Sequence, residues 1–194
     1  VADEGFVLLS ADYSQIELRL AAHLSGDENM RRAFREGLDI HTMTAANVFG
    51  VAMDAVEPHM RRQAKIINFA TIYGVSPFGL SQQADITPGE AKVFIEKYFE
   101  TYPGFRNYMD RMIAFAREHG YVETLLGRRR SVPEINSSVS FRREGAERVA
   151  INTPIQGTSA DMIKCAMVRI HRIFAERGLR SRMILQVHDE LVVE

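Results

Sequence analysis

The sequence of 194 residues contains no tryptophan and a single cysteine, Cys165. One thiol cannot build a disulfide framework or a cysteine metal cage, and this scarcity fits a reducing compartment. No apolar run approaches the roughly 18 residues that cross a membrane. No basic segment precedes the short apolar run near the N-terminus, as a secretory signal would require. We therefore expect a cytoplasmic protein with no membrane partner.

Several common catalytic patterns are also missing. The sequence has no Gly-Lys dipeptide and no G-x-G-x-x-G, which excludes a Walker loop and a typical dinucleotide-binding turn. The segment Gly74-Val75-Ser76-Pro77-Phe78 lacks the second glycine of a nucleophile elbow. The six histidines are scattered without the spacing of a zinc site. Hydrolase and dehydrogenase functions are disfavoured accordingly.

Positive charge is present but unevenly distributed. The net charge is −1, which argues against a protein that coats nucleic acid by charge alone. Lysine is scarce, because the 24 basic residues include only four lysines. Residues 128–148 carry a cluster of arginines: Arg128, Arg129, Arg130, Arg142, Arg143 and Arg148. This cluster could follow a phosphate backbone, or it could be an ordinary solvated face.

The apolar pattern predicts strands at both ends of the chain and helices between them. The run at 6–11 indicates a buried strand that ends at Asp12, and Ser14 with Glu17 matches a capping box for a helix to His23. The last residues, "RMILQVHDELVVE", predict two strands around a two-residue turn. A hairpin is expected around Gly127. Helices are expected at 28–36, 41–49, from Pro58 onward, 77–84, 88–101, 104–119, 140–152 and, after an interruption at Thr153-Pro154, to Arg177.

These elements give a mixed α/β fold of the α+β kind, rich in helix. We expect the terminal strands to meet in one sheet, with the central helices projecting as a subdomain. The chain starts without methionine and stops within "ELVVE", and we expect it to be a piece of a larger protein.

Carboxylates stand at the ends of two predicted strands. Asp12 closes the first strand, and Asp189 lies in the last hairpin turn beside Glu190. Carboxylates that converge in this way can hold divalent ions for phosphoryl transfer. Aspartate also suits turns and strand ends for backbone reasons alone, and the capping box alone would account for Glu17.

The segment "RRQAKIINFATIYG" at 61–74 places two cations and two aromatic rings at every fourth position. On a helix, Arg61, Lys65, Phe69 and Tyr73 share one surface that drifts by roughly 40° per step. The cations suit a polyphosphate, and the rings suit a sugar and a base. The alternative is a core stripe with two cations that reach out to solvent.

This segment has the form of a family motif. "DYSQIELR" at 12–19, "RRQAKIINFATIYG" at 61–74 and "QVHDELV" at 186–192 resemble, in the same order, the three signature motifs of the A-family DNA polymerases of the bacterial type. "GDEN" at 26–29, "DIHT" at 39–42, "GYVETLLGRRR" at 120–130 and "NTPIQGTSADMIK" at 152–164 extend the resemblance over essentially the whole chain. One departure is Ala70, where the family usually has glycine.

The resemblance implies a role for each matching residue. Asp12 and Asp189, with the backbone carbonyl of Tyr13, would hold two Mg²⁺ ions, and Lys65 would join the two aspartates as a catalytic residue. His41, Arg61 and Lys65 would bind the triphosphate. Phe69 would pack on the sugar, and Tyr73 would stack at the template position beside Glu17, the steric gate against a 2′-hydroxyl. Contacts to the primer-template duplex would come from Arg128, Asn152, Gln156 and His188.

The resemblance also implies an architecture and a reaction. Residues 1–30 and 136–194 would form parts of a palm with an antiparallel sheet as its catalytic floor, and residues 31–135 would form the fingers. The reaction would be template-directed DNA synthesis in replication or repair, by transfer of a deoxynucleoside monophosphate from a dNTP to a primer 3′-hydroxyl. We expect a monomer that works in the bacterial cytoplasm at the nucleoid. The alternatives are a nucleic-acid-binding fragment without turnover and a purely structural helical domain.

Overall fold

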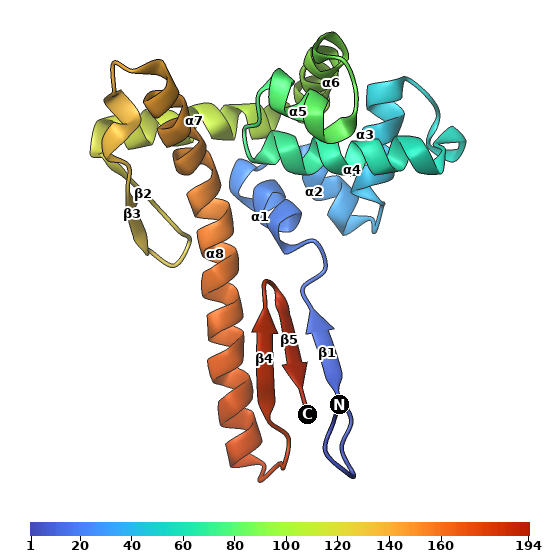
Figure 1. Ribbon diagram of the computed structural model, residues 1–194, viewed down its shortest axis with the longest axis vertical. Helices are drawn as coiled ribbons and strands as arrows, with labels where there is room; N and C mark the ends of the chain where they lie inside the picture. Colours follow the sequence, from blue (N-terminus) through green and yellow to red (C-terminus); the bar gives the residue numbers. More distant parts are fainter.

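The computed structural model describes residues 1–194, in which a broad layer of helices lies above a narrow stalk (Figure 1). The helices are α1 Ile16–Ser25, α2 Glu28–Arg35, α3 Ile40–Phe49, α4 Pro58–Ile72, α5 Pro77–Ala84, α6 Pro88–Thr101, α7 Pro103–His119 and α8 Ser140–Glu176. The strands are β1 Leu9–Asp12, β2 Tyr121–Glu123, β3 Arg129–Ser131, β4 Met183–Val187 and β5 Glu190–Val193. Short 3₁₀ turns occur at Met53–Ala55 and Pro133–Asn136. The helix-rich α+β fold is therefore confirmed.

The two ends of the chain meet in one antiparallel sheet with the strand order β1-β5-β4. Asp12 is opposite Glu190, and Leu9 is opposite Val193. The sheet stands beside the lower half of α8 in the stalk, with both termini near its lower end (Figure 1). The expected meeting of the terminal strands is confirmed, and so is the two-residue turn between β4 and β5.

The expectation that the first strand is buried is wrong. All four residues of β1 are exposed, and the strand starts only at Leu9. Leu185 on β4 is 55% exposed, and Leu191 is the one apolar residue of the sheet that is buried. The apolar run at 6–11 indicated a strand correctly. Whether that strand is buried depends on which other elements pack against it, and the run itself carries no information about them.

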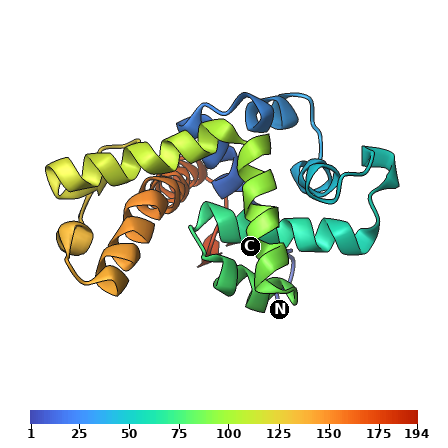
Figure 2. The same cartoon turned by 90° about the horizontal axis from the view of Figure 1, so that it is seen from above.

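The main core lies in the helical layer. Tyr98, Tyr102, Phe105 and Tyr108 are fully or almost fully buried there, together with apolar residues of α1 to α6 and of α8. Ala70 belongs to this core. A smaller cluster joins α7, α8 and the β2–β3 hairpin. Seen from above, α7 and the upper part of α8 lie side by side, and α3 and α4 extend to the other side (Figure 2).

Two helix starts show when a local signal decides the structure. At α6 the Thr87 hydroxyl accepts from the Glu90 N–H, and the Glu90 carboxylate accepts from the Thr87 N–H, so this capping box is confirmed. At α1 the predicted capping box is wrong. The N-cap is Gln15, whose φ of 55° is left-handed, and no side chain caps the helix there. Glu17 is therefore free for another partner.

The predicted interruption at Pro154 is wrong as well, because α8 runs for 37 residues through it. Proline removes one helical hydrogen bond and crowds the preceding turn. Here the surrounding residues Ala150, Ile151 and Ile155 are buried against neighbouring helices, and the Tyr108 hydroxyl donates to the Ile151 carbonyl at 3.0 Å. Tertiary packing holds the helix through the proline. None of the helices, α8 included, is long and apolar enough to cross a membrane.

Candidate functional site

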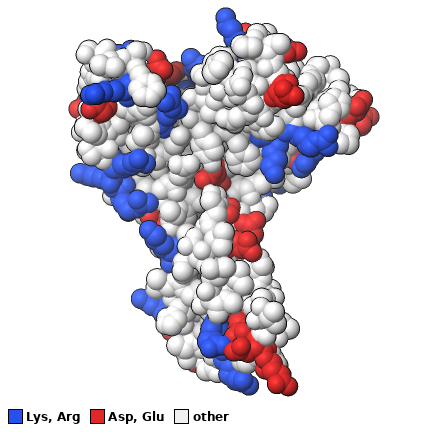
Figure 3. All heavy atoms as spheres, viewed as in Figure 1, with Lys and Arg blue, Asp and Glu red and all other residues white.

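A cavity of about 410 Å³ lies where the upper end of the sheet meets the helical layer. Its walls come from β1, α1, α3, α4 and the β4–β5 turn. Eight of the predicted site residues line it: Asp12, Glu17, His41, Arg61, Lys65, Phe69, His188 and Asp189. On the face shown in Figure 3, acidic atoms lie near the top of the sheet, with basic atoms to either side. Residues far apart in the sequence thus converge on one concave, charged site.

Asp12 and Asp189 are brought together by the pairing of the terminal strands. Asp12 ends β1 opposite Glu190, and the Tyr13 N–H donates to the Asp189 carbonyl at 3.3 Å. The tight turn places His188 at a left-handed φ of 56°, with its Nδ1 2.9 Å from Asp189 Oδ1. This hydrogen bond to Asp189 raises the pKa of the His188 imidazole. The sheet therefore fixes both aspartates at one wall of the cavity.

The donor set at this wall suits a hard cation. The aspartates supply carboxylate oxygens and Tyr13 supplies a carbonyl, whereas Mg²⁺ prefers oxygen ligands and keeps several waters. The Tyr13 carbonyl accepts only one long hydrogen bond, from the Ile16 N–H at 3.3 Å. No group of three or more His, Cys, Asp or Glu side chains forms a metal site in the chain. The residues fit a cation that also takes ligands from water or substrate.

The opposite wall is the face of α4 that the sequence indicated. Arg61 donates from Nε to Asp39 Oδ2 at 2.5 Å, and Asp39 also caps α3 by accepting from the His41 N–H. Burial acts to raise the pKa of Asp39, but the hydrogen bonds from Arg61, Thr42 and His41 outweigh it and lower the pKa. Lys65 is exposed and forms no ion pair within the chain. One cation is thus held in place and the other is available to an anion.

His41 is 3% exposed and lies behind these cations. Its Nδ1 is 2.9 Å from Asn68 Nδ2, and its ring centroid is 6.0 Å from that of Phe69. Burial lowers the pKa of His41, and the charges of Arg61 and Lys65 lower it further against the opposing effect of Asp39. A neutral imidazole beside two cations keeps an N–H that can donate to an anion.

Glu17 and Tyr73 form a second fixed pair at the edge of the cavity. The Tyr73 hydroxyl donates to Glu17 Oε2, and the Asn152 amide donates to the Tyr73 carbonyl at 3.3 Å. Burial raises the pKa of Tyr73, and its bond to Glu17 raises it further. Glu17 lines the cavity but is only 8% exposed, and its carboxylate binds Tyr73 at the end of α4 and does not cap α1.

The other predicted contacts lie outside the cavity. Arg128 donates to Asp161 Oδ1 at 2.8 Å and to the Gly157 carbonyl at 3.0 Å, which ties the hairpin loop to α8. Gln156 is exposed on α8, one turn after Asn152. The Tyr13 side chain lines a separate, mostly apolar hollow against α8. The structure does not bring these residues to the cavity itself.

Sequence reasoning missed four residues that shape the site. Gln15 and Ile16 line the cavity, Asp39 holds Arg61, and Asn68 faces His41. Asp39 falls inside the recognised "DIHT" segment, and Asn68 falls inside "RRQAKIINFATIYG". Asp39 lies at the start of α3, and Asn68 lies on α4 but off the face that carries Arg61 and Lys65. Only their contacts with Arg61 and His41 in the folded structure reveal them.

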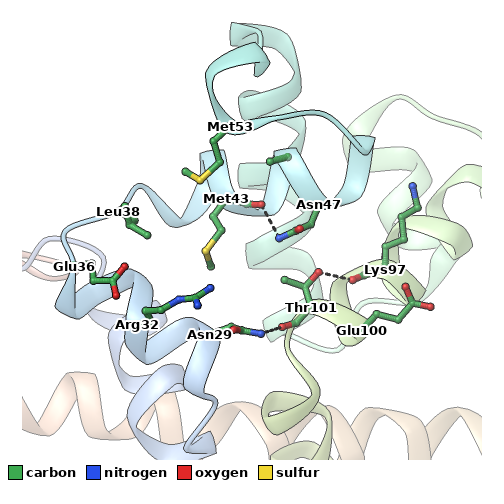
Figure 4. A pocket seen from close by; sticks show the side chains of 11 residues that line it. Asn29, Arg32, Glu36, Leu38, Met43, Asn47, Met53, Lys97, Glu100 and Thr101 are labelled. Carbon is green, nitrogen blue, oxygen red and sulfur yellow. Dashed lines mark hydrogen bonds between the residues drawn. The ribbon is translucent and has the colours of Figure 1, made fainter.

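A larger hollow of about 640 Å³ lies between α2, α3 and α6 (Figure 4). Several of its polar groups already serve to join or complete these helices. Asn29 donates to the Thr101 carbonyl at 2.8 Å, Asn47 donates to the Met43 carbonyl at 3.0 Å, and Lys97 donates to the Val48 carbonyl at 2.6 Å. Size alone would favour this hollow, but the convergent carboxylates and cations are in the smaller cavity.

The whole chain matches one known protein family. The sequence pattern of DNA polymerase family A matches residues 1–194, and the chain belongs to this family. The chain is 53% identical over 194 residues to a DNA polymerase I of Chloroflexus aurantiacus and covers 20% of its length. It is 54% identical over 194 residues to the thermostable DNA polymerase I of Thermus aquaticus and covers 23% of it. The chain thus spans about a fifth of the length of these curated relatives.

A solved structure shares the fold. The whole chain superposes with a TM-score of 0.94 and 48% identity on 34% of a chain described as the POL domain of Pol1 from M. smegmatis in complex with DNA primer-template and dNTP. The likeness covers both the helical layer and the sheet, because it extends over 100% of this chain.

Proposed function

We propose that this chain forms the nucleotide-binding and catalytic part of a DNA-directed DNA polymerase. The reaction is transfer of a deoxynucleoside monophosphate from a dNTP to a primer 3′-hydroxyl, directed by a template, in replication or repair. The observation that supports it best is the single cavity in which two strand-end carboxylates face the Arg61–Lys65–Phe69 surface of α4. Phosphoryl transfer depends mainly on positioning and charge stabilisation, which such a site supplies.

Each wall of the cavity has a part in holding the nucleotide. Lys65, Arg61 and His41 bind the triphosphate oxygens, with Lys65 also stabilising charge on the departing pyrophosphate. Phe69 packs against the sugar. Glu17, held by Tyr73, occupies the space that a 2′-hydroxyl would need. Arg61 exchanges its bond to Asp39 for the nucleotide, or shares its remaining N–H groups with it.

Asp12, Asp189 and the Tyr13 carbonyl hold Mg²⁺ in this proposal. The chemistry that two such ions supply when bound is stabilisation of charge on the attacking and leaving oxygens. No side chain acts as a covalent nucleophile. The aspartates orient the site.

The duplex lies along the side of the molecule that carries Arg128, Asn152, Gln156 and His188. The polar side chains among these can contact minor-groove acceptors that are common to all correct base pairs. In this arrangement residues 1–30 and 136–194 belong to the palm, and residues 31–135 form the fingers. The relative that was solved with DNA primer-template and dNTP supports both ligands for this chain.

Primer extension tests the proposal. The chain, and a protein complete enough to be active that contains it, are given primer-template, dNTP and Mg²⁺, with EDTA as the control. We expect template-directed extension that EDTA abolishes, and an increased dNTP KM in Lys65→Ala with little change in duplex affinity. Duplex binding without extension in both proteins would favour the nucleic-acid-binding fragment. Loss of duplex binding in Lys65→Ala with an unchanged KM would make α4 a DNA-backbone surface.

A further inference from the structure

A row of buried polar side chains lies behind His41. Thr44, Asn68 and Tyr102 are 1%, 0% and 0% exposed and come from α3, α4 and the junction between α6 and α7. Thr44 Oγ1 is 2.9 Å from both Tyr102 Oη and Asn68 Oδ1, and Asn68 Nδ2 is 2.9 Å from His41 Nδ1. None of the three lines the cavity, and His41 is the cavity residue to which Asn68 is hydrogen-bonded.

The contact between Asn68 and His41 has a direction that chemistry sets. An amide NH₂ can only donate, so Asn68 Nδ2 donates to His41 Nδ1 at 2.9 Å. Thr44 Oγ1 lies 2.8 Å from the Ile40 carbonyl, 2.9 Å from Asn68 Oδ1 and 2.9 Å from Tyr102 Oη, so it packs the Asn68 amide in place. Burial raises the pKa of Tyr102 to about 12, so its hydroxyl stays protonated. A ring nitrogen that accepts a hydrogen bond carries no proton, and the neutral ring then carries its proton on Nε2.

The charges around His41 favour the neutral ring. Arg61 and Lys65 on α4 oppose an imidazolium, Asp39 at the start of α3 favours one, and Tyr102 between α6 and α7 is uncharged. The remaining titratable groups face it across the cavity from β1, α1 and the β4–β5 turn: Asp12, Glu17, His188 and Asp189. Burial and the two cations together outweigh Asp39, since the pKa of His41 is lowered.

We infer that Asn68 is a positioning residue that holds His41 in the neutral form with its Nε2–H directed to the cavity, where it donates to the triphosphate. The inference rests on the proposed function. Nδ1 is occupied by Asn68, Nε2 has no hydrogen-bond partner within the chain, and the ring lines the cavity. The other neutral tautomer would present a lone pair to an anion and would repel it. Asn68 thus selects the tautomer that can bind phosphate.

The tautomer of His41 is directly measurable in the unliganded chain. Long-range ¹H–¹⁵N correlation spectra of the 194-residue chain at pH 7 distinguish a protonated from an unprotonated ring nitrogen, and a His41→Gln spectrum assigns the signal. We expect an unprotonated Nδ1 and a protonated Nε2. A proton on Nδ1, in either the neutral ring or the imidazolium, would overturn the inference, and this result needs no variant of Asn68.

A change of the amide to a carboxylate tests the role of Asn68. In Asn68→Asp both side-chain oxygens can only accept when ionised, so Nδ1 must carry the proton and the midpoint of the His41 titration should rise by about one pH unit or more. The matched control is Asn47→Asp, the same change on an exposed residue of α3 whose amide donates to the Met43 carbonyl. An equal rise in both variants, or none in Asn68→Asp, would contradict the inference.

The pH dependence of the dNTP KM separates this inference from the proposed function. In an active protein that contains the chain, Asn68→Asp should move the pH dependence of KM upward together with the His41 titration, and Asn47→Asp should not. If His41 carries a proton on Nδ1 in a protein that is an active polymerase, the inference about Asn68 is overturned and the proposed function stands. The expected tautomer in a protein that neither binds dNTP nor extends a primer would overturn the proposed function.

Discussion

At the scale of single residues, the Glu17–Tyr73 pair has the most specific consequence. Glu17 is 8% exposed and accepts from the Tyr73 hydroxyl, so its position beside the proposed sugar site is fixed by the end of α4. If its carboxylate occupies the space of a 2′-hydroxyl, Glu17→Ala removes a clash and should admit ribonucleotides. The ratio of kcat/KM for dNTP and NTP measures this.

Glu17→Gln is the matched control, because it keeps the side-chain volume and an oxygen that can accept from Tyr73. We expect it to retain most of the selectivity against ribonucleotides. Equal selectivity in the parent and in Glu17→Ala would limit Glu17 to its structural contact with Tyr73.

Phe69 gives a second prediction at this scale. A single added oxygen atom, in Phe69→Tyr, should change the selectivity between deoxy and dideoxy substrates. A dideoxynucleotide lacks the 3′-hydroxyl that would satisfy a nearby charged group, and Phe69 offers no replacement. Phe69→Tyr could supply the missing donor, and a hydrogen bond to a charged group is worth about 1.5 to 3 kcal/mol, or about ten- to more than a hundredfold in selectivity. We expect Phe69→Tyr to remove most of the discrimination against dideoxynucleotides.

Phe69→Leu has no hydroxyl and should leave the discrimination in place. The measurement is again a ratio of kcat/KM values, here for deoxy and dideoxy substrates. A change of less than about threefold in Phe69→Tyr, far below the hydrogen-bond estimate, would mean that the ring does not face the sugar.

At the scale of elements, the hairpin β2–β3 is tied to α8 through one carboxylate. Asp161 accepts from the Thr124 hydroxyl at 2.7 Å and from Arg128 Nε at 2.8 Å, and the Asp161 side chain is 11% exposed. Gly157 allows the close approach, since a Cβ there would lie 2.6 Å from Thr124 Cγ2. The position of Arg128, which is proposed to contact DNA, therefore depends on its hydrogen bond to Asp161.

This carboxylate predicts a pH dependence of stability. Burial acts to raise the pKa of Asp161, but the bonds from Thr124 and Arg128 outweigh it and the pKa falls below the ordinary 3.8. Because the folded-state pKa is depressed, the stabilisation is complete well above pH ~3.8 and is lost as the pH falls through the folded value. Asp161→Asn should be less stable than the parent to urea at pH 7, with the difference shrinking in acid.

Asp110→Asn is the control for this series, since Asp110 pairs with Arg106 at 3.8 Å on an exposed surface of α7. Exposed ion pairs contribute little to stability, so the stability of Asp110→Asn to urea should equal that of the parent at every pH. A difference between Asp161→Asn and the parent that persists undiminished below pH ~3 would contradict the assignment to the carboxylate.

The elements also show what a sequence can predict. The start of α6 followed from Thr87 and Glu90 because both partners of the capping box lie within one turn. The same motif at Ser14 and Glu17 failed, because Glu17 bonds to Tyr73, which is 56 residues away. Pro154 failed for a similar reason, since burial against other helices keeps α8 continuous. Sequence signals within one turn predicted the type of each element. Contacts with residues far along the chain explain why the predictions at Glu17 and Pro154 were wrong.

The candidate site follows the same division. Periodicity placed Arg61, Lys65 and Phe69 on one face of α4, and the structure keeps them on one wall. Asp39 and Asn68 could not be found in this way, because their partners Arg61 and His41 lie on different helices. The resemblance to a family identified the sequence segments that contain Asp39 and Asn68, and the structure showed which residues they contact.

At the scale of the whole molecule, the pairing of the two chain ends is what creates the site. Asp12 and Asp189 are 177 positions apart, yet β1 and β5 pair side by side below the helical layer. The cations of α4 reach the same cavity from above. We therefore propose that the strand-end carboxylates and the α4 cations act on one nucleotide.

The most direct test is primer extension by Asp189→Ala at saturating dNTP and Mg²⁺, in a protein complete enough to be active, with duplex affinity measured in parallel. If the carboxylate acts on the transition state as proposed, the rate should fall far more than tenfold while duplex binding stays within a few fold. A variant that kept more than about a tenth of the parent rate, a loss of less than ~1.4 kcal/mol, would contradict the account.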